Sequence, residues 1–246
     1  MSDSTQTAVV TGASRGFGRA IAAAVVASGA RVIGVARDAR ALREVRAELG
    51  DGFVPVFADA TEDAVAQRVI REHRPNLLVL NAGATPHLAP IHEQSWETFG
   101  RNWETDTKHA FVWIRAALRA PLAPGSAVIA MSSGAALAGS PLSGGYAGAK
   151  SAIRFIRTYA AEESDRAGLG IRFVALLPKL TPATGLGEEA VAGYAARQGI
   201  DVETYLAGMA PMLTPEQVGK AVVELAGDPG SAAEYLVSGA GRKQIG

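Results

Sequence analysis

The chain has 246 residues, with 24 basic and 24 acidic side chains, so its formal net charge is zero. It contains no cysteine, which excludes disulfide frameworks, thiolate zinc sites and cysteine nucleophiles. A balanced charge without a basic run argues against nucleic acid or a membrane surface as a partner.

Short apolar runs alternate with longer helical segments almost from the first residue. The runs that predict buried strands are 8–10, 31–35, 53–57, 77–80, 126–131 and 171–177. The segments that predict helices are 19–28, a charged stretch ending at 49, 63–73, 95–119 and 146–166. Continuous apolar strands separated by helices are typical of a parallel sheet covered on both faces. With no linker or repeat, this predicts one doubly wound α/β domain spanning 1–246.

The region 178–215 interrupts this alternation with four prolines and two short helical patches, 188–197 and 202–209. Long excursions after the carboxyl end of a strand are usually functional, so we expect a substrate lid here. Thr214, Pro215 and Glu216 then predict a helix start, with the helix running to residue 226. Residues 235–237 are expected to add a short last strand.

No side chain between residues 120 and 149 carries a charge. Pro121, Pro124 and Pro141 interrupt this stretch, which therefore does not resemble a membrane-spanning helix. The chain starts with a polar segment that shows no signal-peptide pattern, and we expect a cytoplasmic location. Two features would account for the absence of charged side chains in this stretch: a buried central strand, and a pocket from which water is excluded.

A glycine-rich loop stands where the first strand turns into the first helix. Its residues are Gly12, Ala13, Ser14, Arg15, Gly16, Phe17 and Gly18. Glycine at such a turn lets the backbone approach a pyrophosphate, which faces the free N–H groups at the start of the helix. The loop therefore predicts a dinucleotide cofactor.

The residues at the end of the second strand indicate which of the two nicotinamide dinucleotides, NAD or NADP, is bound. An acidic residue there binds the ribose of NAD, whereas arginine accommodates the 2′-phosphate of NADP. Here Ala36 stands where the carboxylate would be, Arg37 follows, and Arg15 is a second cation within the glycine loop. This favours NADP(H), while the following Asp38 is expected to cap the next helix.

Tyr146 and Lys150 are four residues apart on a predicted helix and so share one face. A phenol is a poor base at neutral pH unless a cation favours its ionised form, which a neighbouring ammonium does. Lys150 could also hold the cofactor ribose. Ser133, just after the fifth strand, offers a hydroxyl that can polarise a substrate carbonyl. Alone, this Tyr–Lys pair could also be a surface tyrosine beside an unrelated lysine.

Together these residues resemble the short-chain dehydrogenases/reductases, over residues 7–226. The glycine loop, Asn81-Ala82-Gly83 after the fourth strand, and the Ser133, Tyr146 and Lys150 set occur in the order of that family. The resemblance implies a Rossmann fold, a hydride transfer with NADP(H), Tyr146 as acid/base and Ser133 on the carbonyl oxygen. It also implies that Lys150 binds the nicotinamide ribose and that Asp59 holds the adenine.

The sequence departs from the family pattern at several positions. Asp106 stands where the family often has a proton-relay asparagine, with Asn102 one helical turn earlier. Either Asp106 takes over that catalytic position or it is an ordinary polar helix residue. The family's Pro-Gly is Pro178-Lys179 here, and Lys179 is expected to face solvent unless it meets an anionic substrate. The usual Asp-Gly-Gly ending is absent.

The remaining histidines and aromatic residues are given ordinary structural roles. The histidines lack metal-ligand spacing and no metal site is expected; His87 and His92 are expected outside the site. Trp96, Trp103, Phe111 and Trp113 are expected to pack on the long helix. Family members commonly pair through this helix and the catalytic one, so a homodimer or homotetramer is expected.

The sequence therefore predicts an NADP-dependent oxidoreductase that acts on a small carbonyl or secondary alcohol substrate. Two alternatives remain. One is a non-catalytic NADP-binding regulator, which would need only the glycine loop. The other is a related dehydratase or epimerase that uses the same tyrosine and lysine.

Overall fold

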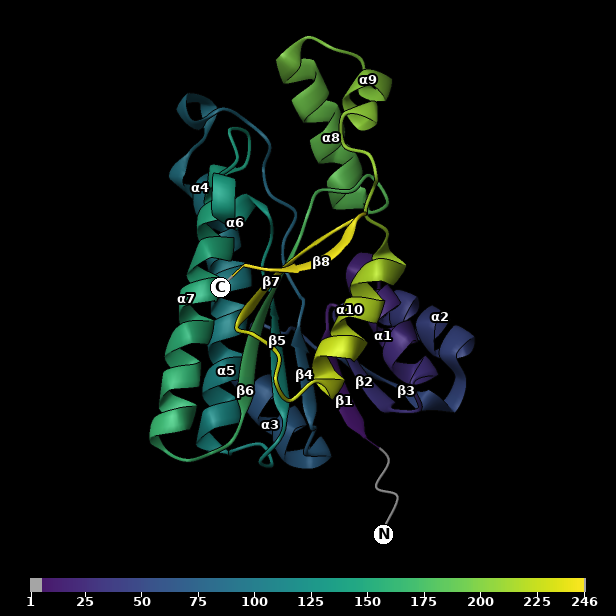
Figure 1. Ribbon diagram of the computed structural model, residues 1–246, viewed down its shortest axis with the longest axis vertical. Coiled ribbons are helices and arrows are strands. Elements are labelled where there is room, and N and C mark those ends of the chain that lie inside the picture. The colour runs from purple at the N-terminus through teal and green to yellow at the C-terminus, as the bar shows by residue number, and fades with distance from the viewer. Residues whose placement is uncertain (1–5, 246) are drawn as a thin grey trace.

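The computed structural model describes residues 6–245 and contains an eight-stranded sheet in the order β3-β2-β1-β4-β5-β6-β7-β8 (Figure 1). Neighbouring strands are parallel from β3 to β7, and β8 is antiparallel to β7. The strands are β1 (Thr7–Thr11), β2 (Arg31–Ala36), β3 (Phe53–Phe57), β4 (Leu77–Leu80), β5 (Ala127–Met131), β6 (Arg172–Pro178), β7 (Glu234–Ser238) and β8 (Gly241–Gln244). The predicted doubly wound α/β fold is confirmed.

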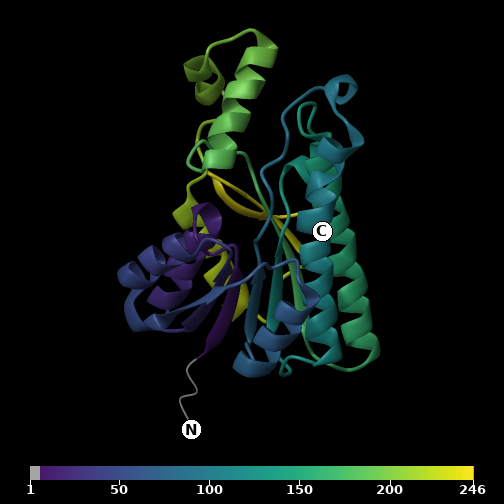
Figure 2. The same ribbon diagram turned by 180° about the vertical axis from the view of Figure 1, so that it is seen from behind.

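Helices cover both faces of the sheet, as Figures 1 and 2 show from opposite sides. The helices before β5 are α1 (Gly16–Ala27), α2 (Ala39–Leu49), α3 (Asp63–His73), α4 (Trp96–Asn102) and α5 (Lys108–Arg119). After β5 come α6 (Ala135–Ala138), α7 (Gly144–Arg166), α8 (Gly185–Gln198), α9 (Val202–Ala207) and α10 (Pro215–Gly227). Short 3₁₀ turns lie at Gly50–Gly52 and Ile91–Glu93.

The buried apolar residues form one core on each face of the sheet. Ile21 of α1, Leu42 of α2 and Val218 of α10 belong to the first core. Val69 of α3 and Trp113 of α5 belong to the second. A strand between two such layers must be apolar on both sides, and every residue of β4 and β5 is indeed buried. The uncharged stretch 120–149 therefore contains a strand, β5, that has no access to water.

The long helix expected over 95–119 is interrupted in its middle. Trp103–Thr107 adopt a π-helical turn between α4 and α5. Such a turn inserts an extra residue into the helical ladder, and it is often found at functional sites. It carries Asp106.

After β6, the structure differs from the sequence-based expectation in one element, β8. The region 178–215 folds into α8 and α9, which rise above the carboxyl end of the sheet (Figure 1). Thr214 caps α10 through a capping box with Gln217, as its sequence predicts. The hairpin strand β8 was not expected, because its residues Gly241–Gln244 are all exposed and carry no apolar pattern. No helix within residues 6–245 is long and apolar enough to cross a bilayer.

Candidate active site

A cavity of about 1520 Å³ opens at the carboxyl ends of the strands. The loops after β1, β2, β3, β4, β5 and β6 contribute to its wall, together with α8 and α9. The sheet order reverses between β1 and β4, and ligands of doubly wound folds bind at such a switch point. The residues that the sequence predicts for catalysis or cofactor binding line this cavity, except Ala13 and Gly18 of the glycine loop.

The glycine loop has the backbone that its sequence predicts. Gly12 and Gly16 have φ angles of +67° and +53°, which side-chain-bearing residues rarely adopt. A Cβ atom on Gly18 would lie 2.0 Å from the carbonyl oxygen of Gly12, so α1 can approach β1 only because this residue is glycine. Arg15, at the N-cap of α1, makes no capping hydrogen bond, and the first turn has no acidic side chain. The amide groups there can therefore receive a pyrophosphate.

Hydrogen bonds join the glycine loop to the loop after β4. The Thr11 hydroxyl donates to the carbonyl of Val79 (3.2 Å) and accepts from the backbone N–H groups of Asn81 (2.9 Å) and Ala82 (3.2 Å). The Asn81 side chain donates to the carbonyl of Thr11 at 3.2 Å. Asn81 therefore holds the two strand ends at the switch point at a fixed separation.

The cavity end formed by the β1, β2 and β3 loops carries the residues expected to select the dinucleotide. Arg37 is largely exposed, and its Nη1 atom lies 3.8 Å from a carboxylate oxygen of Asp59. Asp59 also accepts hydrogen bonds from the N–H (2.8 Å) and hydroxyl (2.9 Å) of Thr61, and the backbone bond most strongly holds its pKa below the usual value. Asp38 accepts from the Ala41 N–H and caps α2, as predicted.

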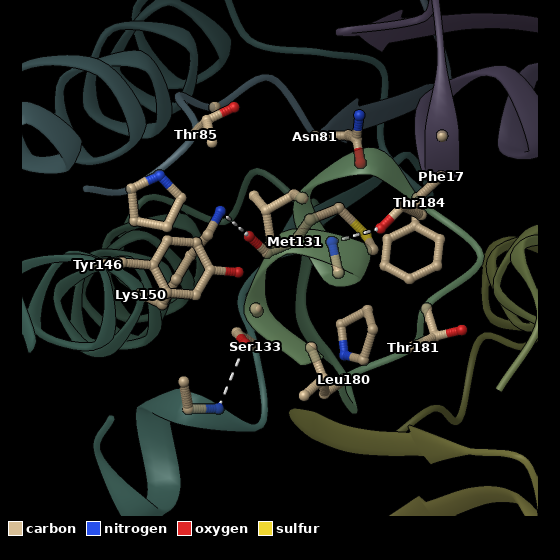
Figure 3. Close-up of a pocket in the computed structure, with 18 of the residues that line it drawn as sticks. Phe17, Asn81, Thr85, Met131, Ser133, Tyr146, Lys150, Leu180, Thr181 and Thr184 are labelled. Carbon is tan, nitrogen blue, oxygen red and sulfur yellow. Dashed lines mark hydrogen bonds between the residues drawn. The ribbon is translucent and has the colours of Figure 1, made fainter. Parts of the chain in front are cut away.

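Tyr146 and Lys150 lie on the first turns of α7, and both face the cavity (Figure 3). The Lys150 Nζ atom is 5.6 Å from the centre of the Tyr146 ring and donates to the carbonyl of Met131 at 3.2 Å. α7 can pack closely against α4 because residue 145 is a glycine. A Cβ atom on Gly145 would lie 2.0 Å from the carbonyl oxygen of Phe99. The Tyr146 hydroxyl points towards the middle of the cavity.

Ser133 lies between β5 and α6, on the same side of the cavity as Tyr146 (Figure 3). Its hydroxyl oxygen accepts a hydrogen bond from the N–H of Ala135 at 3.2 Å, so the hydroxyl proton remains available for a ligand. The neighbouring Ser132 was not identified from the sequence. It is buried and donates to the carbonyl of Lys150 at 2.8 Å, which ties β5 to α7.

Asp106 contacts the lysine directly. One carboxylate oxygen lies 3.1 Å from Lys150 Nζ, and the other accepts from the Ala84 N–H (2.8 Å) and the Asn102 side chain (3.3 Å). The carboxylate fills the space beside Gly83, where a Cβ atom would lie 2.8 Å from it. Asn102 therefore projects on the same side as Asp106, as its spacing predicted.

The ion pair is buried: the side chains of Lys150 and Asp106 are 7% and 1% exposed. Burial alone would lower the pKa of Lys150, but the carboxylate of Asp106 and then the Tyr146 side chain outweigh burial and raise it above its ordinary value. The lysine is therefore an ammonium ion at neutral pH, although it has almost no contact with water. A buried cation of this kind exists only because its counter-ion is buried with it.

His109, three residues after Asp106, was not singled out from the sequence. It is fully buried, and its Nε2 atom has no hydrogen-bond partner among the described residues. Burial, with a smaller contribution from the charge of Lys150, lowers its pKa to about 3. This histidine is therefore neutral and adds no second cation beside the lysine. Only its three-residue spacing from Asp106 could have indicated it.

The expectation for the aromatic residues on the long helix was partly wrong. Trp113 is fully buried, but Trp96, Trp103 and Phe111 are 81%, 41% and 48% exposed. A π turn rotates the helical residues on its two sides relative to each other. The number of apolar residues in the helix therefore does not show which of them face the sheet. His87 and His92 lie outside the cavity, as expected.

The region 178–215 covers one side of the cavity, and a hydrogen bond closes it against the opposite wall. The hydroxyl of Tyr194 on α8 contacts that of Ser140, in the loop between α6 and α7. Ser140 in turn bonds to the hydroxyl of Ser143 at 2.6 Å. Tyr194 also stacks on Tyr205 of α9, with ring centres 6.4 Å apart.

Comparison with known proteins agrees with this geometry. The family model for short chain dehydrogenase matches residues 6–195. A sorbitol dehydrogenase of Cereibacter sphaeroides is 31% identical over 176 residues, covering 69% of each chain. A cis-4-hydroxycyclohexanecarboxylate dehydrogenase of Sinomonas cyclohexanicum is 32% identical over 243 residues, covering 94% of this chain and 91% of the relative.

A shorter match is found with a probable NADP-dependent dehydrogenase of Dichelobacter nodosus. It is 42% identical over 97 residues, which is 36% of this chain and 92% of the relative. The family model alone spans well over half of the chain, and the site that it implies is assembled in one cavity. This chain therefore belongs to the short-chain dehydrogenase family.

Proposed function

We propose that this protein is an NADP(H)-dependent oxidoreductase that interconverts a carbonyl compound and a secondary alcohol, with Tyr146 as its acid/base. The observation that carries the proposal is the position of Lys150. It is a buried ammonium under the ring of Tyr146, in the cavity that Ser133 and the glycine loop also line.

Each residue has a definite task in this proposal. The dinucleotide fits the open N–H groups at the start of α1 and supplies hydride chemistry at its nicotinamide when bound. The Ser133 hydroxyl donates a hydrogen bond to the substrate oxygen, and Tyr146 gives a proton to that oxygen or removes it. Lys150 stabilises the ionised phenol by its charge and donates to the nicotinamide ribose.

Asp106 acts through Lys150 and not on the substrate. It takes up the buried charge of the lysine and fixes Nζ from one side, while the Met131 carbonyl fixes it from another. The π turn places Asp106 within reach of the lysine. An asparagine at this position would hold the lysine without neutralising it. Asp106 is therefore a positioning residue that also sets the charge of the site.

For the dinucleotide we propose NADP(H) over NAD(H). The end of β2 offers Ala36 and the exposed Arg37 in place of a carboxylate, and Arg15 lines the same end of the cavity. The similarity to a probable NADP-dependent dehydrogenase supports the same choice. In the Arg37→Ala variant, Kd for NADPH, measured by fluorescence titration, should rise at least about tenfold, with little change for NADH. Equal losses for both would contradict the proposed 2′-phosphate contact.

We also propose that the protein is a homodimer or homotetramer paired through α5 and α7. Phe111 of α5 and Phe155 and Tyr159 of α7 are 48%, 61% and 59% exposed. Phe155 and Tyr159 stack on each other at 6.5 Å. The two helices are in contact, and we expect a second copy of this chain to cover their exposed aromatic side chains. Pairing through the corresponding helices is common in the family that the chain belongs to.

The central test is the Tyr146→Phe variant. NADPH oxidation with a panel of small ketones should fall by at least about 100-fold, because the phenol that transfers the proton is missing. NADPH binding and the thermal melting temperature should be unchanged. Tyr159→Phe, an exposed tyrosine on the same helix, is the matched control. Unchanged turnover in Tyr146→Phe would overturn the catalytic assignment.

A further inference from the structure

The charged residues that line the cavity are balanced everywhere except at one position. Arg15, Arg37, Asp38 and Asp59 gather at the end formed by the β1, β2 and β3 loops, where the dinucleotide phosphates are expected. Asp106 and Lys150 neutralise each other beside Tyr146. Lys179 is the remaining charged lining residue, and it forms no ion pair with any of the residues 6–245.

The backbone holds Lys179 next to the reacting centre. Its N–H donates to the carbonyl of Val237 at 2.8 Å, and the preceding Pro178 carbonyl accepts from the Gly134 N–H at 2.9 Å. A Cβ atom on Gly134 would lie 3.7 Å from Cα and 3.8 Å from Cγ of Lys179. The lysine stem therefore runs past the residue that follows Ser133. Because β6 and β7 fix the backbone of Lys179, only its flexible side chain is free to change position.

The wall around this cation is otherwise uncharged. The same cavity is also lined by uncharged side chains of α6, of the loop after β6 and of the region 178–215, namely Leu137, Ala138, Leu180, Tyr194 and Met209. None of them can neutralise an ammonium. Lys179 is exposed, so water solvates it when the cavity is empty, but an anionic group in the cavity would give it a charge-assisted hydrogen bond that a neutral substrate cannot offer.

We propose that the substrate is a small keto acid or hydroxy acid whose carboxylate binds Lys179. This inference rests on the proposed function. In this arrangement, the carbonyl or hydroxyl oxygen of the substrate lies at Ser133 and Tyr146. A small ring or a short carbon chain separates this oxygen from the carboxylate. A carboxylate fits better than a phosphate, because the glycine loop with its helix start is the part of the cavity built for phosphate groups. The lysine offers a single point charge with three donors.

The experiment compares each acid with its neutral ester, so that only the charge differs. The probes are 4-oxocyclohexanecarboxylate, 3-oxocyclohexanecarboxylate and levulinate, each beside its methyl ester. For each pair, the ratio of kcat/KM for acid and ester is measured with NADPH. The enzymes are the wild type, Lys179→Met and Lys179→Arg, with Lys220→Met as a matched control. Lys220 lies on the outer surface of α10 and pairs with Glu224.

We expect the wild type to prefer at least one of the acids and Lys179→Met to lower that acid-to-ester ratio about tenfold or more. Lys179→Arg should keep most of the preference and Lys220→Met all of it. A second readout does not need turnover. In the Tyr146→Phe background with NADP bound, calorimetric Kd for the preferred acid should rise by the same factor when Lys179 becomes Met.

The outcomes separate this inference from the proposed function. If the esters are reduced, but the ratio is the same in wild type and Lys179→Met, the carboxylate contact is wrong and the oxidoreductase assignment stands. If Lys179→Met weakens NADPH binding instead of changing the ratio, the lysine belongs to the cofactor site, and the inference is overturned. If no ketone, charged or neutral, is reduced and none binds to the NADPH complex, the proposed function fails first.

Discussion

The most unusual residue of the site is Asp106, a carboxylate buried beside the lysine that supports the proposed acid/base. Removing its charge while keeping its shape separates its two effects. The amide oxygen of Asn can still accept from the Ala84 N–H, but it cannot neutralise Lys150. The ammonium then still contacts the Met131 carbonyl and the Tyr146 ring, but neither of these neutral groups balances its charge.

Asp106→Asn should lower the free energy of unfolding by about 3 to 5 kcal/mol at neutral pH, because it leaves a buried charge unpaired. The pKa of Lys150 should fall, since burial lowers it and the first opposing group is gone. The alkaline loss of activity that accompanies deprotonation of the lysine should therefore occur at lower pH than in the wild type. Urea unfolding and the pH profile of kcat/KM measure the two effects.

The sign of the pH dependence follows from the raised pKa. In the wild type, the folded state binds the Lys150 proton more tightly than the unfolded state does. The stability from this pair is therefore complete below the unfolded-state pKa and is lost as pH rises through the higher folded-state value. The stability difference between wild type and Asp106→Asn should shrink in strongly alkaline solution. Asp165→Asn, an exposed carboxyl-to-amide change on α7, should show no such behaviour.

At the scale of elements, the site depends on how closely α7 approaches its neighbours. Gly145 precedes Tyr146 and lies against the backbone of α4 at Phe99, and Gly148 lies against the ring of Trp103. Small residues on this face let the π turn and α7 come together, and this contact brings Asp106 to Lys150. The helix contact and the ion pair therefore form together.

Gly145→Ala should push α7 away from α4, because its Cβ atom would meet the Phe99 carbonyl oxygen at 2.0 Å. We expect a loss of about 1 to 3 kcal/mol in stability, typical of overpacking, and a fall in kcat larger than the rise in KM for NADPH. Gly227→Ala, at the end of α10 where nothing lies within 4 Å, is the control. Wild-type kcat in Gly145→Ala would show that the approach of α7 does not position Tyr146.

At the scale of the whole molecule, the exposed aromatic residues of α5 and α7 lie outside the cavity. None of Phe111, Phe155 and Tyr159 lines it. These side chains are exposed in the single chain, and the proposed pairing would bury them. The subunit contact would also press on the outer side of the catalytic helix.

Phe155→Glu combined with Tyr159→Glu should convert the proposed oligomer to monomers, because the change places two like charges at the centre of each subunit contact. Size-exclusion chromatography with light scattering measures the mass. Phe57→Glu, an exposed phenylalanine on the distant edge strand β3, should leave the mass unchanged. A wild-type protein that is monomeric at micromolar concentration would contradict the pairing.

Local patterns were enough to predict the parallel sheet and a set of residues that line the cavity. Apolar runs predicted β1 to β6 to within one or two residues, and a glycine loop at a strand-to-helix turn predicted the phosphate side. The four-residue spacing placed Tyr146 and Lys150 on one face of α7. These signals can be read from the sequence because each depends on residues that are close in the chain and on solvent that rejects charge from a buried strand.

The tertiary structure decided the features that depend on residues far apart in the chain. The contact of Asp106 with Lys150 requires a π turn, and no periodic pattern in the sequence predicts that turn. Strand β8 pairs through its backbone and has no apolar pattern that would have predicted it. Lys179 is exposed, as expected from the sequence, and the point at which β6 ends relative to Gly134 decided that it also lines the cavity. The sequence by itself thus determined which groups are present and on which element each lies. Packing between elements decided which charges are paired, because such contacts depend on distances that neighbouring residues do not set.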